Sequence, residues 1–244
     1  MTQIDAARAG ICTPEMKAVA AKEYKTPEEI RDAVAKGIIA IPANINHTTL
    51  DPEGVGEGLR TKVNVNLGIS GDLMDEEMEL EKARIALELG AEGIMDLSNH
   101  GKTREFRRKL LAMSSAMIGT VPMYDAIGYL EKPLIGITAQ DFLDVIRAHA
   151  EDGVDFVTVH AGMNRRVIES FKETGRLMNI VSRGGSLIFA WMEATGNENP
   201  FYEHYDEVLE ILHEYDVTIS IGDAMRPGCT YDASDAGQIA ELIE

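Results

Sequence analysis

Hydrophobic and polar positions alternate in blocks from residue 61 to the end of the chain. Six apolar runs of strand length occur, at residues 62–67, 93–97, 118–121, 155–159, 179–181 and 217–221. Amphipathic patterns predict helices at 76–89, 102–113, 139–151, 164–174, 201–215 and 232–243. Strands that alternate with helices predict a parallel sheet with right-handed crossovers.

The number of units leaves two architectures open. A closed (βα)₈ barrel needs eight units, whereas a doubly wound sheet is complete with six. Polar residues at the carboxyl end of every predicted strand favour the barrel, because all strand ends of a barrel converge on one site. No glycine-rich dinucleotide motif follows the first of these strands. We therefore expect a TIM-type α/β barrel of which this chain supplies about six units.

The first part of the chain has a different pattern. Residues 1–36 read as helical, and Thr13 and Thr26 each precede a proline and an acidic residue, as helix N-caps do. A short apolar strand is expected at 38–41, before a polar loop at 42–47. We expect a helical segment with a substrate-proximal loop over 1–60 and the partial barrel over 61–244.

Composition limits the possible partners. The 244 residues carry a formal net charge of −18, which argues against nucleic acid or an anionic membrane surface. No apolar run approaches the roughly 20 residues of a membrane span, and the N-terminus lacks the apolar core of a signal peptide. The two separated cysteines, Cys12 and Cys229, are typical of a reducing cytoplasm. The sequence thus predicts a cytoplasmic protein that acts on a small molecule.

Three predicted strand ends carry candidate chemistry. His160 could be a structural histidine, or it could bind a ligand or transfer a proton. The run Ser182-Arg-Gly-Gly-Ser186 is compatible with an anion cradle and equally with a capped strand–helix turn. Asp223 and Arg226 could contact a ligand or simply form an ion pair that braces their loop.

Other positions are less informative. Asn64 and Asn66 alternate on one strand, so both face the same side, where buried amides would need partners. Met95 reads first as core packing. No histidines or cysteines stand at metal-ligand spacing, and we assign no metal to this chain.

Seven ordered motifs give a specific resemblance. They include Gly153-Val-Asp-Phe-Val-Thr-Val-His-Ala-Gly162 and Gly222-Asp-Ala-Met-Arg-Pro-Gly228, and the others lie at 41–47, 61–68, 94–98, 118–124 and 180–186. In these motifs the chain resembles the phosphomethylpyrimidine synthase (ThiC) family. It is also similar to a relative of that family, the anaerobic 5-hydroxybenzimidazole synthase.

The resemblance implies a (βα)₈ radical S-adenosylmethionine enzyme, a carbon–carbon lyase of the EC 4.1.99 type. Its substrate would be aminoimidazole ribotide, its cofactors a [4Fe-4S] cluster, S-adenosylmethionine and a divalent metal such as zinc, and its assembly a homodimer. No catalytic residue is assigned. The family's substrate-binding positions correspond to Asn66, Met95, Tyr124, His160, Ser182, Arg183, Gly184, Asp223, Ala224, Met225 and Arg226.

Three family features are absent from the sequence. These are the Glu-Gly-Pro-Gly-His run, the second metal-ligand histidine and the Cys-x-x-Cys-x4-Cys motif that binds the cluster. We expect the cluster and metal ligands to lie beyond residue 244, so that this chain is the N-terminal portion of a longer enzyme. By itself it should not hold the cluster, because two distant cysteines do not replace clustered thiolates, and it is expected to be inactive alone.

Three departures from the family pattern bear on the product. They stand at Val65-Asn66-Leu67, Ser98-Asn99-His100 and Asp223-Ala224-Met225, beside predicted strand ends. A shared substrate with a different product would need such changes, which favours the benzimidazole synthase of cobamide biosynthesis. The alternatives are the pyrimidine synthase of thiamine biosynthesis and a non-catalytic phosphosugar-binding module.

Overall fold

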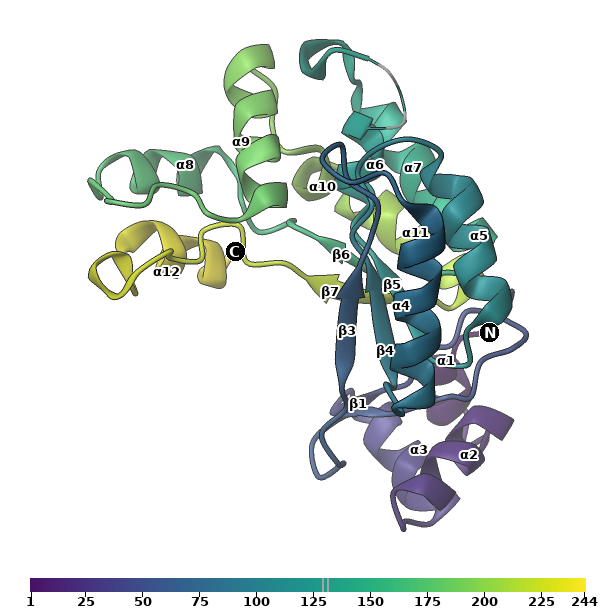
Figure 1. Cartoon of the computed structure of the whole chain (residues 1–244). Coiled ribbons are helices and arrows are strands. Elements are labelled where there is room, and N and C mark those ends of the chain that lie inside the picture. Colours follow the sequence, from purple (N-terminus) through teal and green to yellow (C-terminus); the bar gives the residue numbers. More distant parts are fainter. Residues whose placement is uncertain (129, 131) are drawn as a thin grey trace.

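The computed structural model describes residues 1–128, 130 and 132–244. At its centre is a five-stranded parallel sheet in the order β3-β4-β5-β6-β7 (Figure 1). The strands are β3 (Asn64–Leu67), β4 (Gly93–Asp96), β5 (Met117–Thr120), β6 (Phe156–Val159) and β7 (Thr218–Ile221). Spatial order follows chain order without the reversal that defines a doubly wound sheet. The arrangement is that of a partial TIM-type barrel, with β3 and β7 as the edges of the described sheet.

Helices follow the strands in the expected alternation. The main ones are α4 (Glu76–Glu88), α5 (Thr103–Met113), α7 (Ala139–Asp152), α8 (Arg165–Lys172), α11 (Tyr205–Tyr215) and α12 (Ala236–Ile243). Shorter elements are η1 (Leu134–Gly136), α10 (Pro200–Glu203) and η2 (Thr230–Asp232). No helix in the described part of the chain is both long and apolar enough to cross a membrane.

Three local predictions were incomplete or wrong. The sequence did not predict α6 (Pro122–Gly128) or the full extent of α9 (Arg183–Thr195). The strand expected at 179–181 is not formed. Asn179 has a φ of 57°, in the left-handed region, which interrupts an extended run. The carboxylate of Asp232 binds the N–H groups of Leu177 and Met178 at 2.9 Å and fixes the preceding turn instead.

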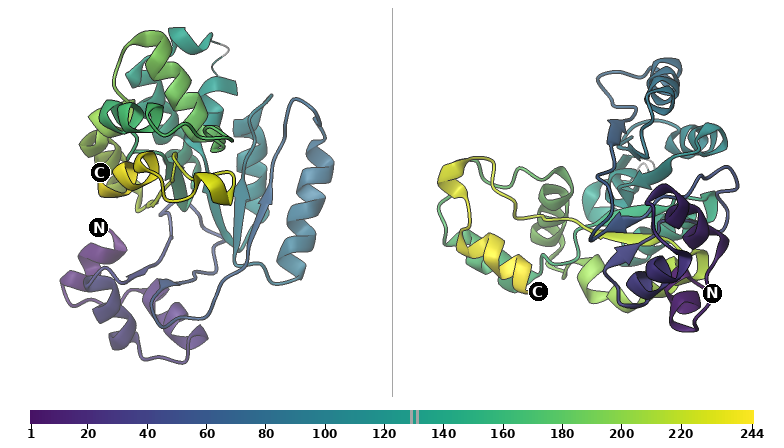
Figure 2. Two further views of the ribbon diagram at one scale, coloured as in Figure 1. Left: turned by 90° about the vertical axis from the view of Figure 1, so that its left-hand side faces the viewer. Right: turned by 90° about the horizontal axis from the view of Figure 1, so that it is seen from below.

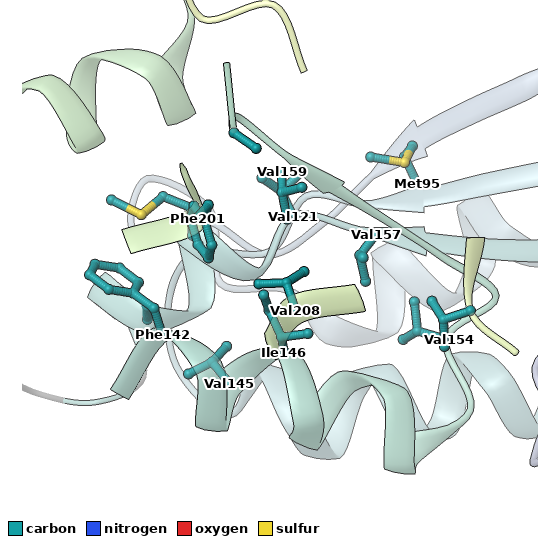
Figure 3. Close-up of a cluster of buried hydrophobic side chains, with 14 of the residues drawn as sticks. Met95, Val121, Phe142, Val145, Ile146, Val154, Val157, Val159, Phe201 and Val208 are labelled. Atoms are coloured by element: carbon teal, nitrogen blue, oxygen red, sulfur yellow. The ribbon is translucent and has the colours of Figure 1, made fainter. Parts of the chain in front are cut away.

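The main hydrophobic core lies between one face of the sheet and the helices that cover it. Val157 of β6, Phe142, Val145 and Ile146 of α7, and Val208 of α11 all belong to this core (Figure 3). Alternate strand residues point to this face, as the period of a strand requires. The apolar sides of α7 and α11 therefore pack these helices against one face of the sheet. The other face is not covered by them.

That other face has one close-packed point. Asn66, Met95, Gly119 and Phe156 are successive partners across β3 to β6. A Cβ atom on Gly119 would lie 2.1 Å from the Phe156 ring and 2.6 Å from Met95 Sδ. Only glycine fits there, so Met95 and Phe156 lie over the backbone of β5.

The N-terminal helices form a second core. α1 (Gln3–Arg8), α2 (Pro14–Lys22) and α3 (Pro27–Ala35) pack on the antiparallel pair β1 (Ile39–Ala40) and β2 (Val55–Gly56). Thr13 and Thr26 accept hydrogen bonds from the third residue of their helices, so both predicted N-caps are confirmed. This segment lies at the other end of the molecule from α8, α9 and α12 (Figure 2).

The polar loop at 42–47 is anchored at the amino end of the sheet. His47 Nδ1 lies 2.7 Å from Asp155 Oδ2, and the Asn44 N–H donates to Asp155 Oδ1 at 3.0 Å. The same carboxylate accepts the N–H of Ile118 at 2.7 Å. Asp155 is completely buried and immediately precedes β6, so it ties the loop to two strands.

Buried charged and polar side chains of α5 and α7 hold α6 in place. Asp125 accepts hydrogen bonds from Thr103, from Arg107 Nη1 at 3.0 Å and from His149 Nε2 at 2.9 Å. Arg107 also binds Asp152 at 2.9 Å, although its own side chain is only 2% exposed. Despite burial, His149 and Arg107 hold the pKa of Asp125 well below its usual range. The network fixes the first turn of α6.

Arg107→Ala should lower the free energy of unfolding by about 3–5 kcal/mol, because two buried carboxylates lose a partner. The control is Arg108→Ala, whose side chain is 59% exposed and pairs with the same Asp152. It should cost less than about 1 kcal/mol. Urea unfolding of both variants measures the difference, and equal small losses would show that Arg107 does not stabilise the fold.

Candidate functional site

Three segments meet at the carboxyl ends of β6 and β7. His160 directly follows β6, Gly222 directly follows β7, and Ser182 is the N-cap of α9 (Figure 1). His160 Nε2 lies 3.1 Å from Ser182 Oγ, and this oxygen also accepts the N–H of Gly185 at 3.1 Å. The predicted helix cap at Ser182 is therefore confirmed, although no strand of the described structure directly precedes it. The anion-cradle interpretation stays a prediction.

Glycines enclose the His160 ring. A Cβ on Gly184 would lie 2.3 Å from His160 Cε1, and one on Gly222 would lie 2.9 Å from Nε2. Both distances are shorter than side chains tolerate, so the imidazole requires glycine on two sides. These glycines bring the backbone of α9 and the end of β7 against one ring.

His160 is buried with one nitrogen unused. It is 3% exposed, and its Nδ1 has no hydrogen-bond partner within the described structure. Burial, reinforced by the positive charge of Arg226 and opposed by Asp223, lowers the pKa of His160 to about 4. The lowered pKa favours the neutral ring near pH 7, and Nδ1 is a buried polar atom without a partner among the described residues.

Tyr124 and Arg183 form the next part of the site. The Arg183 guanidinium carbon lies 5.4 Å from the centroid of the Tyr124 ring, within the range of a cation–π contact. Burial raises the pKa of Tyr124, although Arg183 and Arg226 oppose this shift. Arg183 is exposed, so its guanidinium is held by the ring and still open to an anion.

The loop of Asp223 to Arg226 presents only its two ends to solvent. Ala224 and Met225 are completely buried, whereas Asp223 and Arg226 are exposed. Arg226 Nη1 donates to the backbone oxygen of Asp223 at 3.2 Å. The ion pair suggested by the sequence is not among the described contacts, because this bond does not involve the Asp223 carboxylate.

Asn66 and Met95 lie on the sheet beside this group. They are partners across β3 and β4, and the contacts described for Met95 are with Gly119 and Phe156. Asn66 is exposed, so its amide does not need the buried partner that the sequence suggested. The described contacts do not join either residue to His160.

Two residues that the sequence did not single out contact the loop at 223–226. Glu241 accepts hydrogen bonds from the backbone of Ala224 and Met225, and Arg176 donates to the backbone oxygen of Met225. Neither belongs to a motif, and a glutamate in an amphipathic helix reads as a solvated position. Only the fold brings them to the site.

A cavity of about 730 Å³ borders the loop on the side of α12. Tyr202, Tyr205, Ile221, Asp223 and Glu241 are among its lining residues. His160, Arg183 and Arg226 are not among its lining residues, so the cavity lies beside the cationic groups that could bind an anion rather than between them.

Comparison with known proteins agrees with this geometry. The model of the Radical SAM ThiC family matches residues 2–244. The phosphomethylpyrimidine synthases of Alkaliphilus oremlandii and Alkaliphilus metalliredigens are 61% and 62% identical to the chain over 242 residues. The phosphomethylpyrimidine synthase of Pelotomaculum thermopropionicum is 60% identical over the same length.

The aligned region is nearly all of this chain but only part of each relative. The matches span 99% of this chain but 55–56% of those three relatives, so the chain spans about half of their length. Since both the family model and the relatives cover nearly every residue described above, the chain belongs to the Radical SAM ThiC family.

Proposed function

We propose that the protein is a phosphomethylpyrimidine synthase of thiamine biosynthesis that acts on aminoimidazole ribotide. One observation carries the proposal: over 242 aligned residues, which are 99% of this chain, it is 60–62% identical to relatives of that name. The preference for a benzimidazole-forming enzyme is not supported by these names. They favour the alternative, the pyrimidine synthase.

The positions of the substituted residues explain why the sequence favoured the other product. Ala224 and Met225 are completely buried, and Leu67 is 6% exposed. A Cβ on Gly185 would lie 2.8 Å from the Cα of Ala224, so Ala224 packs on α9. Leu67, Ala224 and Met225 therefore fill space inside the protein, whereas Asn99 is half-buried and His100 is exposed.

The ribotide phosphate is proposed to bind between Arg183 and Arg226. Both guanidiniums are exposed beside the start of α9, and a phosphate there gains charge-assisted bonds and the favourable end of the helix dipole. The positive charge of Arg226 already acts on His160 and Tyr124. The strongly negative protein thus gathers positive charge at one strand-end site.

His160 is proposed to hydrogen-bond a polar group of the substrate through Nδ1. A buried polar atom without a partner costs free energy, and a ligand that supplies the partner regains it. Because Ser182 and two glycines fix the ring, the direction of this bond is set before the substrate arrives.

The two cysteines of the sequence lie in different segments and are fewer than the several thiolates that hold an iron–sulfur cluster. The family name implies a [4Fe-4S] cluster and S-adenosylmethionine, and such clusters are held by several cysteine thiolates. Cys12 lies in the N-terminal segment and Cys229 lies after β7. The described residues contain no group of three or more potential metal-binding side chains. The role proposed for the residues of this chain is to bind the substrate.

Arg183→Ala and Arg226→Ala should each weaken ribotide binding by about 1.5–3 kcal/mol, the value of a hydrogen bond to a charged group. Arg8→Ala, an exposed arginine of the N-terminal segment, is the matched control and should bind like wild type. Titration calorimetry measures all three. Unchanged affinity in both site variants would remove these arginines from the phosphate site.

The imidazole of His160 should titrate with a midpoint of about pH 4. Its ordinary pKa in an unfolded chain is about 6.5, so the neutral ring stabilises the fold above that pH, and this stabilisation is lost as the pH falls toward 4. Nitrogen-15 NMR of labelled histidine follows the titration directly. A midpoint at or above 6.5 would contradict a desolvated, neutral ring.

The product separates the two candidate enzymes. Full-length protein, incubated without oxygen with aminoimidazole ribotide and S-adenosylmethionine, should form hydroxymethylpyrimidine phosphate. Mass spectrometry of the reaction identifies the product. Formation of 5-hydroxybenzimidazole would restore the rejected preference, and a protein that binds the ribotide but forms neither product would be a binding module.

A further inference from the structure

The loop at 223–226 is held by a carboxylate from a distant helix. Glu241 of α12 accepts the Ala224 N–H through Oε1 at 2.8 Å and the Met225 N–H through Oε2 at 2.6 Å. The residue is 7% exposed. Both oxygens of one buried carboxylate are thus used on two successive backbone N–H groups, whose direction they fix.

A buried guanidinium holds the same peptide from the other side. Arg176 Nη2 donates to the Met225 backbone oxygen at 2.5 Å. Arg176 is itself fixed by Asp235, through bonds of 2.6 and 2.8 Å, and by the Phe171 ring, 5.4 Å from its guanidinium carbon. Its side chain is 1% exposed. Met225 therefore has its backbone donor and its backbone acceptor both bound by buried charged groups.

This arrangement is unfavourable for Glu241 itself. Burial and the neighbouring Asp223 carboxyl raise its pKa to about 7, against the two backbone bonds that favour the charged form. A Cβ on Gly162 would lie 3.0 Å from Glu241 Cγ, so the carboxylate is also closely packed. An apolar residue at this position would avoid the free-energy cost of burying a carboxylate. It could not accept hydrogen bonds from the two N–H groups, and so could not orient them. Such a cost is typical of a residue kept for position at a functional site.

We propose that Glu241 and Arg176 are positioning residues of the substrate site. They fix the backbone of Ala224 and Met225, and the loop in turn sets where the side chains of Asp223 and Arg226 stand relative to His160 and Arg183. This inference rests on the proposed function, because it takes Arg226 as a ribotide contact. Neither residue needs to touch the substrate.

The main test is Glu241→Gln, which keeps the size of the side chain but leaves one oxygen for two N–H groups. Its affinity for aminoimidazole ribotide should fall by about tenfold or more, as expected for a lost charged hydrogen bond. The control is Glu169→Gln, the same change at an exposed position on α8, and it should bind like wild type. Calorimetry on the full-length protein measures each affinity.

A double-mutant cycle distinguishes positioning from general destabilisation. If Glu241 acts through the loop, Glu241→Gln should add little to the loss already caused by Arg226→Ala, since the contact that it positions is gone. Full additivity in the cycle, or wild-type affinity in Glu241→Gln, would overturn the proposal. If wild type does not bind the ribotide, the proposed function fails instead.

Arg176→Lys provides a second variant for the cycle. It keeps the charge but replaces the planar fork that binds Met225 and Asp235 together. Arg176→Lys should also bind aminoimidazole ribotide more weakly than wild type. Combined with Arg226→Ala, it should add little to the loss of affinity that Arg226→Ala causes by itself. If Glu241→Gln does not fold, the cycle of Arg176→Lys with Arg226→Ala tests the proposal. Fully additive losses of affinity in that cycle would reject the positioning role.

Discussion

The contact of three segments around the buried His160 ring is the constraint on which the candidate site depends. The end of β6 supplies the ring, Ser182 at the start of α9 binds its Nε2, and glycines of α9 and of the loop after β7 pack on its sides. A side chain larger than glycine at position 184 or 222 would clash with the ring, so the close approach of the segments depends on these two glycines. The positions of Arg183 and Arg226 follow from this packing, since each lies within a few residues of a glycine that encloses the ring.

The support for the site comes from charged groups placed behind it. Asp125 and Arg107 hold the first turn of α6 and thereby Tyr124, while Glu241 and Arg176 hold the loop at 223–226. The buried charges are balanced by specific partners, as desolvated charges must be. The protein thus combines a rigid apolar core on one side of the sheet with ionic networks that orient the loops at the strand ends.

Much of the fold could be predicted from the sequence, for identifiable reasons. The period of α7 and α11 and the apolar runs of β3 to β7 gave the parallel arrangement, and the threonines before Pro14 and Pro27 gave two helix starts. The failure at 179–181 arose because two apolar residues, Ile180 and Val181, do not make a strand when Asn179 is left-handed and Asp232 fixes the turn before them. The residues around His160 could be named from their motifs, and the structure joins them. Glu241 and Arg176 could not be found, because their partners are backbone groups that only the fold brings near.

The site as proposed depends on a ribotide phosphate that binds between Arg183 and Arg226 beside the start of α9. The most direct measurement is a crystal structure of the full-length protein with aminoimidazole ribotide bound. Phosphate oxygens should lie about 2.7–2.9 Å from the nitrogens of both guanidiniums, with a polar substrate atom on His160 Nδ1. A phosphate bound away from both arginines, with Nδ1 still unpartnered, would contradict the account.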